Sequence, residues 1–394
     1  MGVIFSVEYW KSSHFNLAAT MQRNYYIFSN GRLRRRQNTI YFEPVEGGEQ
    51  REESGEEEAE SRQLEAKRLD TEQEVPSENK ETLEAGKQMP RKPIPVEDVE
   101  AFYVFGEVDF NTKLLNFLAQ KKISVHIFNY YGFYSGSYYP REYLNSGFLL
   151  VKQVQTYLDP QKRIALAREI VKTGIDNILR NLKYYQARRS SSTLQKLIKT
   201  IEEHLAAVGR VDTVSELMGI EGRVRERYYE SFNEILSLEE PFVKRVRRPP
   251  DNMLNALISF GNSLLYATTL GEIYRTQLSP TISFLHEPGD RRFSLALDIS
   301  EVFKPLLVDR LIFKVLNTKM LGTDDFDKDL NYGYLKEKGR KVFVQEYDQR
   351  LKTTISHRNL GRKVSYRRLI RLECYKLIKH LMGVQEYRGF RAWW

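Results

Sequence analysis

The hydrophobic pattern of this chain changes character near Pro140, and that change limits the possible fold more than any other feature of the sequence. Before it, short apolar and aromatic runs at residues 101–105 and 124–128 are typical of buried strands. After it, Leu and Ile recur at helical spacing, first in residues 146–158, 160–184 and 191–208. The pattern therefore predicts an α+β fold, in which a small β-rich N-terminal domain precedes a larger all-α-helical C-terminal domain.

We expect the first domain at residues 21–140 and the second at residues 141–394. Within the first, the sequence Ser29-Asn30-Gly31 favours a turn because Asn and Gly tolerate positive φ, and short strands are expected around it in residues 24–42. Residues 111–121 have the pattern of a helix with Asn111 as its N-cap. Residues 133–139 have the pattern of a further strand.

Residues 44–90 are rich in Glu, Gln, Ser and Lys and contain no aromatic side chain. Such a segment cannot bury enough apolar surface to offset its ordering entropy, so we expect a disordered acidic insertion here. Residues 46–87 alone include fifteen acidic and six basic side chains, whereas the whole chain has a formal net charge of +9. The other residues therefore carry +18, and a balance this basic favours nucleic acid as a partner.

The single cysteine, Cys374, excludes an internal disulfide and a cysteine-based metal site, and fits a reducing compartment. Residues 1–20 lack the features of a signal peptide in their required order, and no segment has the ~20 apolar residues that a membrane helix needs. We therefore expect a soluble cytoplasmic protein, with no membrane partner. No Gly-rich phosphate loop, Ser/His/Asp arrangement or Cys/His cluster is present, which argues against nucleotide-driven motors and zinc fingers.

Residues 283–310 combine one histidine, His286, with two acidic residues, Asp298 and Glu301. The acidic residues are three apart and so share a face of a helix, whose surrounding residues are apolar enough to indicate burial. Buried carboxylates need compensation by cations or by a metal. The pattern predicts a divalent-metal site; the alternative interpretation is a packed histidine beside a solvated helix face.

Glu221 lies between two glycines and is the second acidic candidate; its alternative interpretation is an acidic residue in the first turn of a helix. Cations lie close to all these acids in the sequence, and a metal flanked by cations indicates phosphodiester chemistry. A solvated charged face is the alternative interpretation of these cations. The candidate phosphate contacts are Arg248, Arg291, Arg292 and Lys304.

Several blocks of sequence together resemble the CRISPR-associated spacer-acquisition integrase family, whose members are also called endonucleases. They include YYIFSNGRLRRRQNTIYFE, LMGIEGRVRERYYESF, RRPPDNMLNALISFGNSLLY and SFLHEPGDRRFSLALDISEVFKPLLVDR. The resemblance covers residues 21–43 and continues from residue 91 to the C-terminus, and it is greatest to members from type I CRISPR systems. Residues 1–20 precede the usual start of the family, which makes Met21 an alternative initiator, and the segment at 44–90 is longer than the usual connection.

The resemblance implies a β-rich N-terminal domain that forms a homodimer and a helical catalytic domain. It implies a Mg²⁺ or Mn²⁺ site made by Glu221, His286 and Glu301, with Asp298 as an assisting catalytic residue. Many relatives have aspartate where Glu301 stands, and both residue types bind these metals. The implied partners are double-stranded DNA with free 3′ ends, the CRISPR repeat, and a small ferredoxin-like acquisition partner that bridges two dimers.

The implied activity is metal-dependent transesterification, which inserts short foreign DNA fragments into a CRISPR array for antiviral defence. A cation at the site would lower the pKa of an incoming DNA 3′-hydroxyl and stabilise the leaving oxygen, and water in place of the hydroxyl would make the same site a nuclease. Two alternatives stay open from the sequence. One is a non-catalytic structural DNA-binding subunit, and the other is a hydrolytic nuclease that acts on branched DNA in repair.

Overall fold

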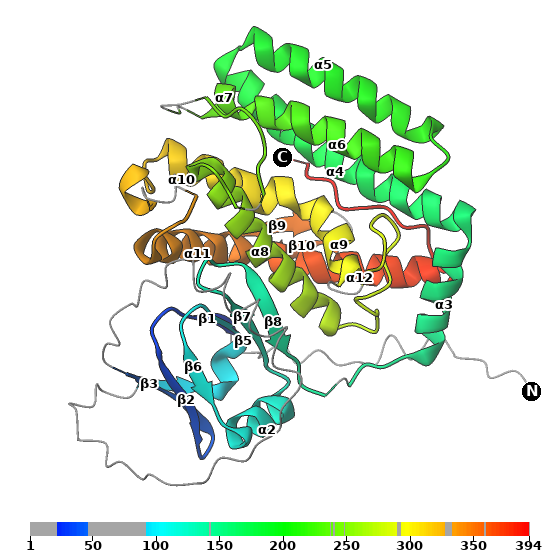
Figure 1. Cartoon of the computed structure of the whole chain (residues 1–394). Helices are drawn as coiled ribbons and strands as arrows, with labels where there is room; N and C mark the ends of the chain where they lie inside the picture. The colour runs from blue at the N-terminus through cyan, green and yellow to red at the C-terminus, as the bar shows by residue number, and fades with distance from the viewer. Residues whose placement is uncertain are drawn as a thin grey trace, which may run out of the picture. The chain divides into compact units, whose positions relative to one another are not determined.

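The computed structural model describes residues 22–45, 92–141, 143–236, 238, 241–247, 249–289, 293–327, 333–357 and 360–393. These residues form two compact units, and Figure 1 follows the chain through both from its blue to its red end. The first unit holds Ser29–Val99 and Gly106–Phe117, and the second holds Arg23–Phe28, Glu100–Phe105 and Leu118–Trp394. The expected N-terminal extension at residues 1–20 and the acidic insertion, apart from its first two residues, lie outside the described residues.

A four-stranded sheet organises the first unit. Its strand order is β4 (Lys92–Pro95), β3 (Thr39–Pro44), β2 (Gly31–Arg36) and β6 (Val108–Phe110). β2 and β3 form an antiparallel hairpin, while β6 pairs with β2 in parallel. Leu33 and Ile40 are completely buried on this sheet. The predicted helix is confirmed as α2 (Thr112–Lys121), and the predicted N-cap is confirmed because Asn111 Oδ1 accepts a hydrogen bond of 2.9 Å from the Leu114 amide.

The turn predicted at residues 29–31 does separate two strands, β1 (Arg23–Ile27) and β2, but these strands belong to different sheets. The hairpin partner of β2 is β3, and the chain reverses at Gln37, which has a φ of 51°. Gly31 is needed for a different reason than the turn. A Cβ at Gly31 would lie 2.5 Å from the carbonyl oxygen of Glu43 on the neighbouring strand, so only glycine fits this close approach.

A second four-stranded sheet belongs to the second unit. Its order is β1, β5 (Val99–Val104), β7 (Ser124–Phe128) and β8 (Tyr134–Tyr138). β5 and β7 are parallel and β8 is antiparallel to β7. Phe102 and Tyr103 are completely buried, as expected of a strand covered on both faces. The strands predicted from residues 101–105, 124–128 and 133–139 are therefore confirmed.

Helices make up most of the rest of the second unit. In chain order they are α3 (Gly147–Leu158), α4 (Pro160–Arg189), α5 (Ser192–Ala207), α6 (Val214–Glu230), α7 (Phe232–Ile235), α8 (Met253–Tyr274), α9 (Ser294–Lys304), α10 (Arg310–Asn317), α11 (Glu337–Lys352) and α12 (Tyr366–Leu381). The prediction of a helical C-terminal region is confirmed, with one correction. Residues of β9 (Thr354–His357) and β10 (Arg362–Ser365) form an antiparallel hairpin, so the region is not entirely helical.

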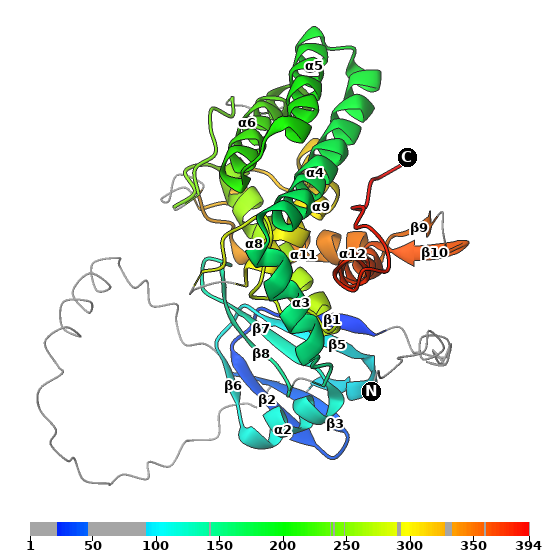
Figure 2. The same cartoon turned by 90° about the vertical axis from the view of Figure 1, so that its right-hand side faces the viewer.

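The buried helix α9 lies against α4 and α8, and α4 also packs against α5 and α6, as Figures 1 and 2 show. Asp159 is the N-cap of α4: its side chain accepts hydrogen bonds of 3.1 Å from the amides of Gln161 and Lys162, and Pro160 takes the first helical position. α9 continues into a π-helical turn, η4 (Pro305–Asp309). Among the described helices, none combines the length and apolar character needed to cross a membrane.

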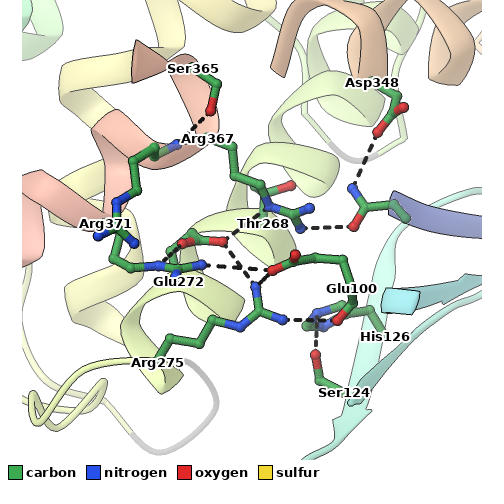
Figure 3. A network of polar contacts seen from close by, with 12 residues as sticks. Glu100, Ser124, His126, Thr268, Glu272, Arg275, Asp348, Ser365, Arg367 and Arg371 are labelled. Carbon is green, nitrogen blue, oxygen red and sulfur yellow. Dashed lines mark hydrogen bonds and ion pairs between the residues drawn. The ribbon is translucent and has the colours of Figure 1, made fainter. Parts of the chain in front are cut away.

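A buried ionic network joins the second sheet to the helices, and Figure 3 shows Glu272 of α8 among three arginines. Glu272 accepts hydrogen bonds from Arg367 at 3.1 Å and Arg371 at 2.6 Å, and Arg275 donates to the backbone oxygen of Glu100 at 2.9 Å. The second compact unit includes Arg23–Phe28, Glu100–Phe105 and Leu118–Trp394, so β1, nearly all of β5, β7 and β8 group with the helices and the two compact units do not divide at residue 140. The predicted dimerisation role of residues 21–140 stays a prediction.

Candidate active site

Two helices bring Glu221 and Glu301 together. Glu221 lies on α6, which starts with a capping box: Thr213 Oγ1 accepts from the Glu216 amide at 3.2 Å, and Glu216 accepts from the Thr213 amide at 3.2 Å. This start places Glu221 in the middle of α6, which excludes the first-turn interpretation. Glu301 lies on α9 and is only 6% exposed, so the alternative interpretation of a solvated helix face is wrong for this residue.

Arg225 joins these two carboxylates, one turn after Glu221 on the same helix. Its Nε donates to Glu221 Oε1 at 3.0 Å, and its Nη2 donates to Glu301 Oε2. Lys304 donates to the other oxygen of Glu301. The side chain of Arg225 is only 12% exposed, so this pairing is largely removed from water. The sequence separates Glu221 and Glu301 by 80 positions, and the fold makes them share one cation.

Asp298 holds the loop that carries His286. Its carboxylate is fully buried near the middle of α9 and accepts hydrogen bonds from the amides of Phe284 at 2.7 Å, Leu285 at 3.0 Å and His286 at 3.0 Å. The Nδ1 atom of His286 lies 2.8 Å from Asp298 Oδ1. The imidazole is therefore held at Nδ1, which leaves Nε2 as the ring atom for other chemistry. Asp298 orients His286, and both of its oxygens are already used.

Electrostatics at the site favour charged side chains. Burial acts to lower the pKa of His286, but the hydrogen bond and charge of Asp298, with the charge of Glu301, raise that pKa above its ordinary value. Burial acts to raise the pKa of Glu301, but Lys304, Arg225 and His286 hold that pKa well below its usual range. Burial raises the pKa of Asp309 to about 6, although Arg225 and Lys304 act against it. The site thus keeps Glu301 ionised and His286 easily protonated.

A small pocket opens beside the acidic pair. Its polar lining consists of Glu221, Arg225 and Glu301. The rest of its wall is apolar and comes mainly from α4, with Val224 and Leu285 completing it. α4 and α9 are in contact here, since a Cβ at Gly174 would lie 3.4 Å from the backbone oxygen of Glu301. Carboxylates on an apolar wall interact with a cation more strongly than they would in water.

The donor atoms fit a divalent cation, but the protein's own cations contact them here. Among the described residues, no group of three or more His, Cys, Asp or Glu side chains is placed to hold a metal ion. Arg225 and Lys304 both donate hydrogen bonds to Glu301, and Nδ1 of His286 lies against Asp298. Glu221 and Glu301 both contact the guanidinium of Arg225, and carboxylate oxygens with an imidazole are the donor types that suit Mg²⁺ or Mn²⁺.

Of the four residues predicted to contact phosphate, the structure describes only Lys304. Arg248, Arg291 and Arg292 lie outside the described residues. Lys304 is described, and its side chain is 21% exposed and paired with Glu301. Sequence reasoning missed Arg225 and Asp309. The i,i+4 spacing of Glu221 and Arg225 was a signal for the first, whereas Asp309 sits in an apolar run that gives no sign of a polar role.

The matching family model and the similar curated proteins all point to the same protein family. The family model described as CRISPR associated protein Cas1 matches residues 69–349. A CRISPR-associated endonuclease Cas1 of Thermodesulfovibrio yellowstonii is 49% identical over 372 residues, which cover 94% of this chain and 100% of that protein. A CRISPR-associated endonuclease Cas1 of Clostridium perfringens is 45% identical, over 95% of this chain and 100% of its own.

Solved structures agree with these relatives. The Cas1 protein from Thermotoga maritima has a TM-score of 0.73 and 41% identity, over 94% of this chain and 100% of its own. A casposase bound to an integration product has a TM-score of 0.74 at 17% identity, over 94% of this chain and 93% of its own, which shows likeness of fold. The family match and the identities along nearly the whole length establish that the chain belongs to the CRISPR-associated Cas1 family.

Proposed function

We propose that this protein is a metal-dependent DNA endonuclease and integrase, which inserts short DNA fragments into a CRISPR array by transesterification. The observation that carries the proposal is the pair of carboxylates, Glu221 and Glu301, that share one cation in a pocket next to the loop of His286. The endonuclease names of relatives at 49% and 45% identity support the same chemistry. Type I membership stays a prediction from the sequence.

Glu221, Glu301 and Nε2 of His286 would hold Mg²⁺ or Mn²⁺ at this site. When bound, such a cation lowers the pKa of an attacking 3′-hydroxyl and offsets the charge that develops on the scissile phosphate. Asp298 fixes the ring of His286 so that Nε2 keeps one direction. If His286 instead transfers a proton, the same orientation and raised pKa let it donate from Nε2 to a leaving oxygen.

The proposed substrates are double-stranded DNA with free 3′ ends and the CRISPR repeat, and the proposed assembly is a homodimer joined by a small ferredoxin-like acquisition partner. The basic balance of the chain outside its acidic segment supports a polyanionic substrate. We expect Arg248, Arg291 and Arg292 to contact phosphates. Lys304 reaches phosphate only if it leaves Glu301, which a bound metal would favour.

An integration assay tests this proposal. The full-length protein and its acquisition partner receive Mn²⁺, a short duplex with free 3′-hydroxyls and a supercoiled plasmid that carries a repeat. We expect His286→Ala to reduce joined product by at least about 100-fold, because it removes a ligand or proton donor at the reacting atoms. His204→Ala is the matched control, because His204 lies on α5 and is partly exposed outside the site.

Three other results of this assay would contradict the proposal in different ways. Cutting without joining by the wild type would favour a hydrolytic repair nuclease. DNA binding with neither reaction would favour a structural subunit. Equal joining by His286→Ala and the wild type would remove His286 from the site.

A further inference from the structure

Arg225 lies among three carboxylates from three different elements. It donates to Glu221 on α6 at 3.0 Å and to Glu301 on α9, and its Nη1 lies 4.0 Å from Oδ2 of Asp309 on η4. With a side chain that is 12% exposed, the guanidinium has little water to replace a lost partner. A buried arginine that loses one carboxylate therefore needs another within reach.

Asp309 has the properties of such a second partner. The residue is 2% exposed, at the end of the π-helical turn that follows α9. Its Oδ2 receives no hydrogen bond from the part of the chain that the structure describes. A buried carboxylate oxygen without a donor is costly, so it has a physical reason to attract the nearest cation. π-helical turns are also frequent at functional sites.

We propose that Arg225 is an internal substitute for the metal: it neutralises Glu221 and Glu301 in the metal-free protein and turns to Asp309 when a divalent cation binds those two carboxylates. This inference rests on the proposed function, since it needs a metal at that pair. A doubly charged cation repels the guanidinium and takes its acceptors, and Asp309 supplies a carboxylate at the distance of a side-chain rotation. Arg225 and Asp309 are then positioning residues that set metal affinity.

The test measures Mn²⁺ affinity by titration calorimetry, with the full-length protein and no DNA. We expect Asp309→Asn to weaken Mn²⁺ binding about 10-fold, as is typical when a residue behind the metal ligands is lost. Arg225→Met should instead tighten Mn²⁺ binding, because it removes the competing cation. In the Arg225→Met background, Asp309→Asn should change the affinity much less, because no arginine then needs a new partner.

A control variant separates this role from loss of a buried charge in general. Glu373→Gln changes another buried carboxylate, on α12, which accepts from the Tyr387 hydroxyl at 2.7 Å and lies outside this site. We expect it to leave Mn²⁺ affinity unchanged. If Asp309→Asn does not fold, the sign of the Arg225→Met effect still decides, since an arginine that only orients the two glutamates would give weaker binding when removed.

The outcomes against the inference differ from those against the function. Equal Mn²⁺ affinity for Asp309→Asn and the wild type, or an equal loss in both Arg225 backgrounds, would overturn the inference and leave the metal site in place. A crystal structure with Mn²⁺ bound and Arg225 still on Glu301 would do the same. A wild-type protein that binds no Mn²⁺ would overturn the proposed function and this inference together.

Discussion

At the scale of single residues, Asp298 determines the position and ring orientation of His286. One carboxylate accepts three backbone amides and faces Nδ1 of the ring, so it fixes the loop and the imidazole together. Asparagine at this position has one carbonyl oxygen and no charge, and therefore cannot replace either function fully. Because both oxygens of Asp298 already have partners, we propose that Asp298 orients His286 and that Glu301 is the direct metal ligand.

We expect Asp298→Asn to lower the pKa of His286, because the loss of the charge leaves burial as the main influence on the ring. A raised pKa in the folded state adds stability that is fully present below the pKa of an unfolded histidine and is lost as the pH rises through the folded value. The variant should lose that contribution at low pH. A proton NMR titration of His286 measures the shift, with Asp212→Asn on the exposed surface as the control; an unchanged pKa would contradict the prediction.

At the scale of elements, close approach of helices places the acidic residues. α8 runs beside η4, and Gly261 allows it: a Cβ there would lie 2.6 Å from Val308 Cγ1 and 3.2 Å from the ring of Phe343. The π-helical turn that carries Asp309 thus depends on a small residue in a different helix.

Gly261→Ala should lower the free energy of unfolding by about 1–3 kcal/mol, because the added methyl group enters a packed interface. Gly219→Ala is the matched control within helix α6, since its Cβ would meet Arg223 Nη1 at an ordinary 3.5 Å. Alanine is the better helix former, so this control should gain up to about 1 kcal/mol. Urea unfolding measures both variants; a gain in stability for Gly261→Ala would show that the interface between α8 and η4 accommodates the added methyl group.

At the scale of the whole molecule, the second unit is held together by charge as well as by its apolar core. Glu272 is completely buried, and Arg367 and Arg371 of α12 donate to it while Arg275 connects it to Glu100. This network joins segments from opposite ends of the sequence. It gives a physical reason why a sheet predicted for the first domain packs with the helices.

We expect Glu272→Gln to lower the free energy of unfolding by about 3–5 kcal/mol, because buried arginines lose their carboxylate. Glu202→Gln is the control, since its pair with Lys183 is exposed and should contribute about 0–1 kcal/mol. Thermal and urea unfolding compare the two. A loss for Glu272→Gln no greater than for the control would mean that the network does not stabilise the unit.

The sequence by itself determined the elements and the residue types of the site. The period of the apolar residues predicted α2, β5, β7 and the helices after residue 146, because periodicity is a local property of the chain. It also singled out Glu221, His286, Asp298 and Glu301, through their residue types and the family resemblance.

Only the tertiary structure decided which of those residues meet and what lies between them. Sharing of Arg225 by Glu221 and Glu301 depends on the packing of α6, α4 and α9, which no local pattern encodes. The partition of β1 and β2 into different sheets likewise depends on long-range pairing. Asp309 became visible as a candidate only because the fold buries its free oxygen next to a buried arginine.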